Sequence, residues 1–111
     1  MSVPQMNSLT GKTIRWTFVD GPVAGTTFEH VFSDDGSVTW RILDGPHQGA
    51  TAREKSYAAV KVNERTWAVS YLGASGHTLT VVLNVDDHRA IGFASSEKSW
   101  YTFNGTFEVL E

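Results

Sequence analysis

The sequence predicts an all-β protein, a single antiparallel up-and-down barrel of eight or nine strands. Apolar and polar residues alternate with a period of two through most of the 111-residue chain, as half-buried strands require. Short polar segments separate these alternating runs at the spacing of hairpins. Only residues 50–59 suggest a helical turn, and the periodicity there is weak.

The first three strands are predicted at residues 12–19, 27–32 and 37–42. One face of these strands carries nine side chains, eight of them apolar, and we expect it to point into the barrel. Its members are Ile14, Trp16, Phe18, Phe28, His30, Phe32, Val38, Trp40 and Ile42. The opposite face places Glu29 between Arg15 and Arg41, which predicts a solvent-exposed ion-pair ladder. An inverted barrel would bury Glu29 and Arg41, but the aromatic content of the first face argues against it.

Five further strands complete the barrel. They are expected at about Tyr57–Val62, Thr66–Leu72, Thr78–Val85, Ala90–Ser95 and Trp100–Val109. The last counts as two strands if it breaks at Asn104-Gly105. A closed barrel removes exposed sheet edges and has room for packed side chains or one small ligand, and a sandwich is the alternative. We expect residues 11–111 to form one domain and residues 1–10 to be a flexible N-terminus.

A repeated segment gives the predicted barrel two different ends. The run Asp20-Gly21-Pro22-Val23-Ala24-Gly25-Thr26-Thr27 returns 24 residues later as Asp44-Gly45-Pro46-His47-Gln48-Gly49-Ala50-Thr51, each copy following a strand. In an up-and-down barrel, loops 20–26, 44–56, 73–77 and 96–99 share one end, and tight turns share the other. This arrangement predicts a cup with its site at the loop-rich mouth. The alternative is that the longer loops only bridge wider gaps between strands.

Composition argues against several classes of function. The net charge is −3 and there is no basic run, so we expect no nucleic-acid partner. Cysteine is absent, and the four histidines show no ligand-like spacing, so we expect no metal. Glycine-rich nucleotide motifs are also missing, so we expect no cofactor. No segment has the length of a membrane span and the N-terminus does not resemble a signal peptide, so we expect no membrane and a cytoplasmic location.

The predicted interior contains one imidazole, His30, which needs a hydrogen-bond partner if it is buried. Tyr57, Ser70 and Tyr71 are the candidates for that partner. His30 is either a structural histidine or a polar or acid–base group inside an aromatic pocket. The four tryptophans, at 16, 40, 67 and 100, either pack the core or form flat walls for a ligand. The residues predicted to bind a ligand are Trp16, His30, Trp40, Tyr57, Tyr71 and His77.

Several segments resemble the family of molybdenum-cofactor-biosynthesis protein F (MoaF). They are Gly11-Lys12-Thr13-Ile14-Arg15-Trp16, Asp20-Gly21-Pro22, Phe28-Glu29-His30, Asp35-Gly36-Ser37-Val38-Thr39-Trp40-Arg41, Ser70-Tyr71-Leu72, Gly76-His77-Thr78-Leu79-Thr80 and Gly92-Phe93-Ala94-Ser95. The resemblance implies a calycin-like barrel, the architecture of lipocalins and phenolic acid decarboxylases. A decarboxylase-like site would need tyrosines, an Arg and a Glu inside the barrel. The chain has Tyr57, Tyr71, Arg41 and Glu29, but the alternation places Arg41 and Glu29 outside.

Three functions therefore remain open. The first is a lipocalin-like barrel that binds a small hydrophobic or aromatic molecule. The second is a small lyase or isomerase that uses the same cavity, with His30 or a tyrosine as acid–base group; no catalytic residue is assigned. The third is a solidly packed interaction module that acts as a homodimer, with Val31, Val60 or Val62 on its outer surface.

Overall fold

The computed structural model describes residues 9–21, 23–73 and 76–110. The described residues form nine strands and no helix, which confirms the all-β prediction. The strands are β1 (Thr13–Phe18), β2 (Thr27–Phe32), β3 (Val38–Ile42), β4 (Thr51–Glu54), β5 (Ala58–Asn63), β6 (Thr66–Leu72), β7 (Thr78–Asn84), β8 (Arg89–Ser95) and β9 (Trp100–Val109). The predicted flexible stretch 1–10 lies mostly outside the described residues; near its end, Leu9 is buried in the core.

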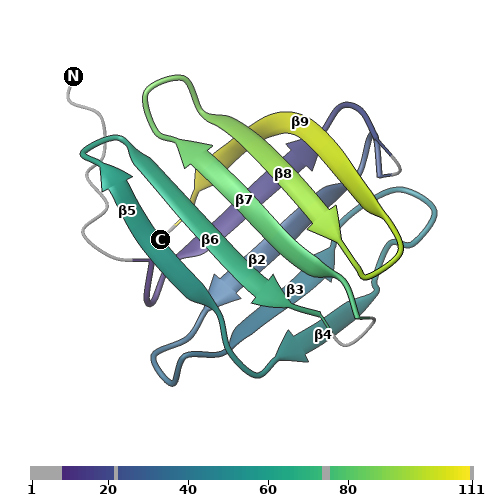
Figure 1. Ribbon diagram of the computed structural model, residues 1–111, viewed down its shortest axis with the longest axis horizontal. Coiled ribbons are helices and arrows are strands. Elements are labelled where there is room, and N and C mark those ends of the chain that lie inside the picture. Colours follow the sequence, from purple (N-terminus) through teal and green to yellow (C-terminus); the bar gives the residue numbers. More distant parts are fainter. Residues whose placement is uncertain (1–8, 22, 74–75, 111) are drawn as a thin grey trace.

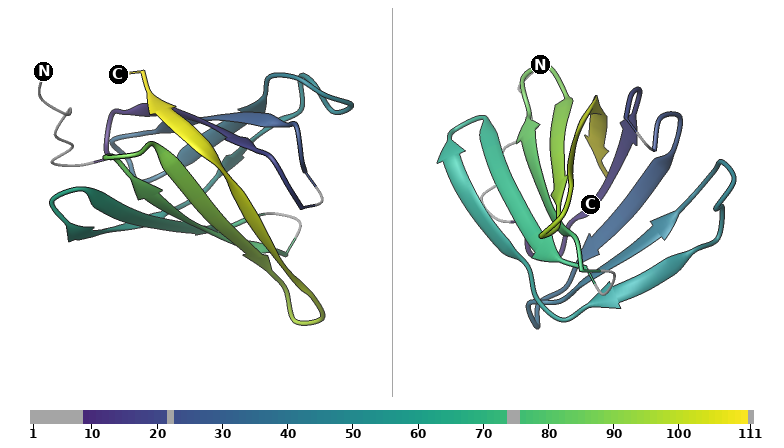
Figure 2. Two further views of the ribbon diagram at one scale, coloured as in Figure 1. Left: turned by 90° about the horizontal axis from the view of Figure 1, so that it is seen from above. Right: turned by 45° about the vertical axis from the view of Figure 1, so that its right-hand side comes forward.

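The nine strands make one antiparallel sheet in the order β4-β3-β2-β1-β9-β8-β7-β6-β5. Seven of its eight ladders join strands that follow one another in the chain, and the eighth joins β1 to β9. The sheet curls so strongly that its β1–β4 part faces its β5–β9 part across the interior (Figures 1 and 2). The structure thus confirms the up-and-down topology.

Strand β4 was not expected, since its residues fall in the predicted loop 44–56. It pairs with β3 and ends the sheet at one edge, while β5 ends it at the other. Within the described residues no ladder joins these two edges, so the barrel keeps a seam between β4 and β5 rather than closing fully. The ninth strand therefore comes from residues 51–54, and β9 runs without a break through Asn104-Gly105.

The connections after β1, β3, β6 and β8 share one end of the sheet as predicted, but the predicted loop 44–56 lies there only in its first part, because residues 51–54 form β4. The chain leaves β1, β3, β6 and β8 at one end of the sheet, on the right in Figure 1. Strands β4 and β5 run in the same direction on either side of the seam, because each is antiparallel to its only neighbour. The additional strand therefore leaves the direction of every later strand unchanged.

The repeated sequence builds the same loop twice. In both copies the sixth residue, a glycine, closes the loop onto the preceding strand: the Gly25 N–H donates to the carbonyl of Phe18 (2.7 Å), and the Gly49 N–H to that of Ile42 (2.9 Å). Two more bonds recur with the same offset, Ala24 to Gly21 with Gln48 to Gly45, both 3.2 Å, and Thr26 to Val23 with Ala50 to His47, both 3.0 Å. Gly21 and Gly45 both have positive φ (78° and 85°), which explains why glycine is the second residue of each copy.

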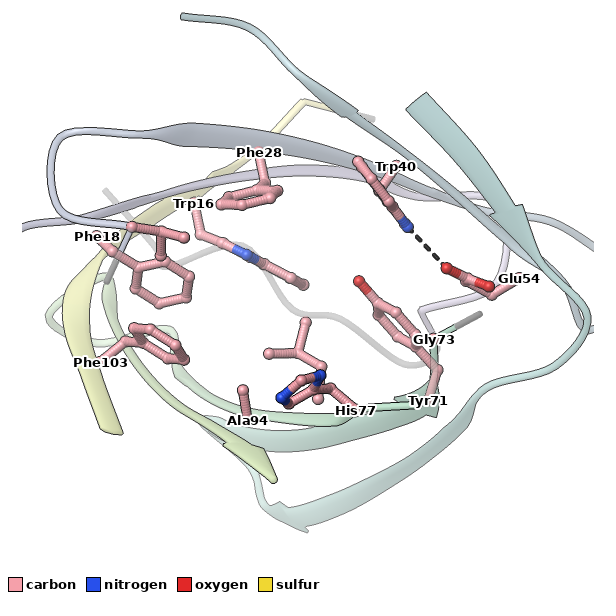
Figure 3. Close-up of a pocket in the computed structure, with 12 residues that line it drawn as sticks. Trp16, Phe18, Phe28, Trp40, Glu54, Tyr71, Gly73, His77, Ala94 and Phe103 are labelled. Carbon is pink, nitrogen blue, oxygen red and sulfur yellow. Dashed lines mark hydrogen bonds between the residues drawn. The ribbon is translucent and has the colours of Figure 1, made fainter. Parts of the chain in front are cut away.

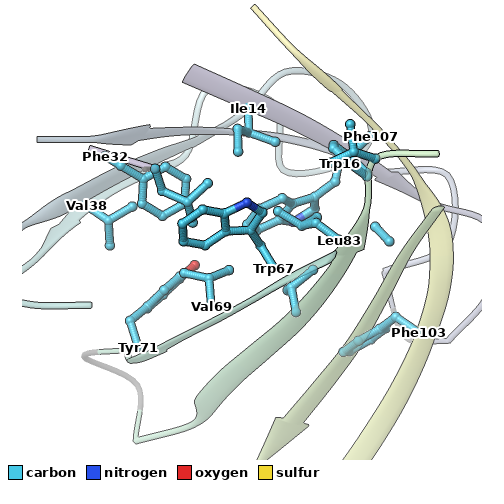
Figure 4. Packing of buried hydrophobic residues seen from close by; sticks show 14 of the residues in the cluster. Ile14, Trp16, Phe32, Val38, Trp67, Val69, Tyr71, Leu83, Phe103 and Phe107 are labelled. Carbon is cyan, nitrogen blue, oxygen red and sulfur yellow. The ribbon is translucent and has the colours of Figure 1, made fainter. Parts of the chain in front are cut away.

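The core lies between the two halves of the curled sheet, β1–β4 and β5–β9 (Figure 4). The predicted inward face is found inside, and Trp67, Val69, Val81 and Leu83 cover it from the other half of the sheet. On the outer face, Glu29 accepts hydrogen bonds from Arg15 (2.9 Å) and Arg41 (3.1 Å). This confirms the ion-pair ladder, so Glu29 and Arg41 are not part of an interior site.

Candidate functional site: an aromatic cavity with one carboxylate

A cavity of about 240 Å³ opens into the cup from its loop-rich end (Figure 3). Twelve residues from both halves of the sheet line it. They are Trp16, Phe18, Val23, Phe28, Trp40, Glu54, Tyr71, Gly73, His77, Leu79, Ala94 and Phe103. Val23 belongs to the first copy of the repeated loop, and Gly73 and His77 follow β6. The cavity thus lies at the loop-rich end of the sheet, where the sequence predicted a site.

Strand alternation explains the aromatic walls. Trp16 and Phe18 are inward positions of β1, and Phe28 is the inward position opposite Trp16 on β2. Phe103 of β9 packs on Phe18 with ring centroids 4.9 Å apart, and Phe28 meets Trp40 edge-on at 6.3 Å. These rings come from four strands, and together they leave a space with flat apolar sides.

His30 lies one layer behind this wall and is fully buried. Its Nε2 shares a 2.7 Å hydrogen bond with the Tyr71 hydroxyl, and its ring stacks on Trp16 at 3.9 Å. Tyr71 is therefore the partner among the three candidates: Ser70 bonds Thr80 at 3.1 Å, and Tyr57 lies 3.3 Å from the Thr10 hydroxyl.

The environment keeps both members of this pair uncharged near neutral pH. Burial lowers the pKa of His30 to about 3, because the interior disfavours the imidazolium. Burial, with a smaller contribution from the charge of Glu54, raises the pKa of Tyr71 above its ordinary value. His30 Nδ1 and Trp16 Nε1 are buried without a hydrogen-bond partner among the described residues.

Glu54 is the carboxylate of the cavity, and sequence reasoning missed it. It is the last residue of β4, is only 6 % exposed, and lies opposite Val38 of β3. Its Oε2 accepts a 2.9 Å hydrogen bond from Trp40 Nε1 (Figure 3). The available signal was the alternation of Ala52 and Glu54 with exposed Thr51 and Arg53, but it spans only four residues.

The six predicted ligand-binding residues are found in different places. Trp16, Trp40, Tyr71 and His77 line the cavity. His30 supports Tyr71 and Trp16 from behind, and Tyr57 packs on Phe32 (4.9 Å) away from the lining. Contact with a ligand stays a prediction for each of them. Of the other tryptophans, Trp67 is in the core, whereas Trp100 is 76 % exposed.

Two further properties bear on the kind of site. Across residues 9–21, 23–73 and 76–110, no three His, Asp or Glu side chains are grouped so that they could hold a metal ion. In the same part of the chain, no helix has the length and apolar character needed to cross a membrane.

The fold and the cavity define a small antiparallel β-barrel protein with an aromatic interior. Residues 1–99 match the model of the MoaF N-terminal domain, and the chain belongs to that family. This confirms the resemblance noted in the sequence.

Among solved structures, one from Burkholderia vietnamiensis, described provisionally as a beta-lactamase, is similar with a TM-score of 0.78. It is 20 % identical, and the match covers 99 % of this chain and 100 % of that one. At this identity the likeness shows the shared fold alone. A search of curated proteins gave no match.

Proposed function

We propose that this protein binds one small hydrophobic or aromatic molecule in the cavity of its cup, in the cytoplasm. The observation that carries the proposal is the cavity of about 240 Å³ with walls of tryptophan and phenylalanine. Because the cavity opens at the loop-rich end, its apolar walls face water when no ligand is bound, and a ligand that covers them removes apolar surface from water. At roughly 30 Å³ per water molecule the cavity equals about eight waters, enough for one ring with a short chain.

The state of the His30–Tyr71 pair supports binding over the lyase or isomerase alternative. A general acid or base works best with a pKa near the working pH. The pKa of His30, about 3, is far below neutrality, and that of Tyr71 is raised further above it. The two groups bond each other, which fixes the phenol at the cavity wall. We therefore assign His30 the role of holding Trp16 and Tyr71 in place.

The provisional description of the structural neighbour does not extend to this chain. Serine β-lactamases carry a Ser-x-x-Lys motif. Ser95-Ser96-Glu97-Lys98 has that spacing, but it is the exposed end of β8 and the turn that follows. Neither Ser95 nor Lys98 is part of the cavity lining.

An interaction module acting as a homodimer is the second candidate, and strand β5 favours it. β5 is an edge strand on which Val60 and Val62 are 61 % and 58 % exposed. Exposed apolar edge strands can pair with another chain. This surface is compatible with a binding cup, and the two functions make different predictions for one experiment.

Native mass spectrometry of the protein purified from its host, before and after mild denaturation, tests both candidates. We expect a co-purifying small molecule that is released on unfolding. Since only the native state binds such a ligand, adding it back at about a hundred times its Kd should stabilise the fold by about 2.7 kcal/mol. A ligand-free dimer that no compound of a broad aromatic and lipid panel stabilises would instead favour the interaction module.

A further inference from the structure

Glu54 is a carboxylate in an environment that otherwise suits an apolar ligand. An ionised carboxylate offers about four acceptor positions, and removing it from water is costly unless a charge or several donors compensate it. From the described part of the chain, the Glu54 carboxylate accepts one side-chain hydrogen bond, from the neutral indole of Trp40. Its charge is felt inside the cup, since it contributes to the raised pKa of Tyr71.

Among residues 9–21, 23–73 and 76–110, no Lys or Arg side chain forms an ion pair with Glu54. The neighbouring cations, Arg53 and Lys55, are both exposed, and Arg53 pairs with Asp35 at 2.6 Å. The alternation of β4 therefore points its positive charge, Arg53, outward and its negative charge, Glu54, inward.

The surrounding rings favour a positive charge as well. Trp40 donates to Glu54, and Trp16, Phe28 and Tyr71 line the same space. The faces of aromatic rings attract cations, most strongly those of tryptophan, and the attraction grows when water is excluded. A carboxylate beside several aromatic faces is thus complementary to an organic cation in both charge and shape.

We propose that the cavity selects ligands with a protonated amine on a small hydrophobic or aromatic frame, with Glu54 as the counter-ion of the amine. This inference rests on the proposed binding function and adds the chemical class of the ligand. The frame occupies the space between Trp16, Phe18 and Phe103, and the ammonium group lies between Glu54 and the rings of Trp40 and Tyr71.

A second hollow beside Glu54 gives the ammonium group a second open side. It has a volume of about 510 Å³ and lies between the end of β4 with residues 55–56 and the end of β6, and Glu54 and Gly73 line both it and the cavity. An amine at Glu54 can therefore keep part of its hydration while its frame is buried, which lowers the desolvation cost of binding.

Three probes of one ring size separate charge from apolar contact: benzylamine, benzyl alcohol and benzoate. We expect the full chain to bind benzylamine roughly tenfold more tightly than benzyl alcohol, with benzoate weakest, by calorimetric titration at neutral pH. Glu54→Gln keeps the size of the side chain and an acceptor for Trp40. It should remove the preference for the amine and leave the affinity for benzyl alcohol within about twofold.

Glu108→Gln is the matched control, because it removes the same charge from an exposed position of β9. It should leave all three affinities unchanged. Glu54→Gln should also unfold at the same or a higher temperature than the parent without ligand, since a purely structural carboxylate would destabilise when replaced.

The experiment distinguishes a wrong role for Glu54 from a wrong binding function. Equal affinities of the parent for the amine and the alcohol, or an unchanged amine affinity in Glu54→Gln, would overturn the role of Glu54 while leaving a binding cup. No binding of any of the three probes would overturn both. The charge series on the parent protein does not depend on how well the variant folds.

Discussion

His30 makes the free energy of unfolding depend on pH, because among the described residues it is the histidine that is buried. Its ring is held between Trp16 and the Tyr71 hydroxyl, and it stays neutral there. In the unfolded chain the same ring has an ordinary pKa of 6.5. The folded and unfolded states therefore bind different numbers of protons between about pH 3 and pH 6.5.

We predict that acid destabilises this protein partly through His30. In that window the unfolded state binds the proton that the folded state excludes, so the free energy of unfolding rises with pH. One pKa unit corresponds to about 1.4 kcal/mol, so going from pH 7 to pH 5 should cost about 2 kcal/mol through this residue. Urea unfolding at a series of pH values measures the slope.

His30→Gln should flatten that slope, because glutamine has no proton to gain and can still bond Tyr71. His47→Gln is the control, since His47 is exposed in the second repeated loop. If the pH slopes of the parent and His30→Gln coincided, the account of a neutral buried imidazole would be wrong.

The Tyr71 hydroxyl is the partner that compensates the burial of His30 Nε2. We predict that Tyr71→Phe lowers the free energy of unfolding by about 1–3 kcal/mol, because the imidazole is then buried with neither nitrogen satisfied. Chemical denaturation measures the change. Tyr101→Phe removes a hydroxyl from a half-exposed ring on β9 and should change stability little. Similar losses in the two variants would contradict the importance of the buried bond.

At the scale of the strands, alternation predicted eight of the nine, and it failed at β4 for a physical reason. The rule identifies a strand by a regular apolar face, and β4 has only Ala52 and Glu54 on its inner side. A carboxylate at an inward position looks like a surface residue until the fold shows what surrounds it. The same cause hid Glu54 from the candidate site.

The parts of the site that sequence could predict are those that depend on one strand or on loop order. The faces of β1 and β3 identified Trp16 and Trp40, and the order of the loops identified the mouth and His77. The partner of His30 could not be settled, since Tyr71 lies on β6, across the interior from β2. Contacts between strands that are not sheet neighbours depend on the curl of the sheet, which no local pattern encodes.

Gly105 lies on β9 where that strand pairs with β1, and the two backbones come very close there. A Cβ built at this position would lie 1.9 Å from the carbonyl oxygen of Thr17 on β1. We predict that Gly105→Ala destabilises the fold by about 3 kcal/mol or more, because backbone rather than a flexible side chain would have to move. Thermal unfolding, compared with Thr106→Ala at the exposed neighbouring position, measures the effect. A change as small as that of the control would show that β9 can shift freely along β1.

At the scale of the whole molecule, filling the cavity with a larger side chain should change the affinity for ligands without lowering the stability of the fold. Ala94 lines the cavity, and we predict that Ala94→Leu weakens binding of every small ligand at least about tenfold while leaving the ligand-free protein as stable or slightly more so. Ligand titration followed by thermal unfolding measures both effects. Ala68→Leu, on the alternate face of β6, adds the same atoms outside the cavity and should leave affinity unchanged. If both variants weakened binding equally, the ligand would have to bind elsewhere.

The strand order also fixes how the chain must assemble. Seven ladders are local hairpin contacts, but the β1–β9 ladder brings residues 14 and 109 together, and the entropy of closing that long loop must be lost before the ladder forms. Joining Leu110 to Leu9 by a short linker and opening the chain between Lys55 and Ser56 would turn the sheet into one continuous meander. In this circular permutant every ladder joins consecutive strands. Its folding rate in stopped-flow experiments should exceed that of the parent, because lower contact order speeds folding. The seam that leaves the barrel unclosed is thus also the place where its topology can be simplified without breaking a single ladder.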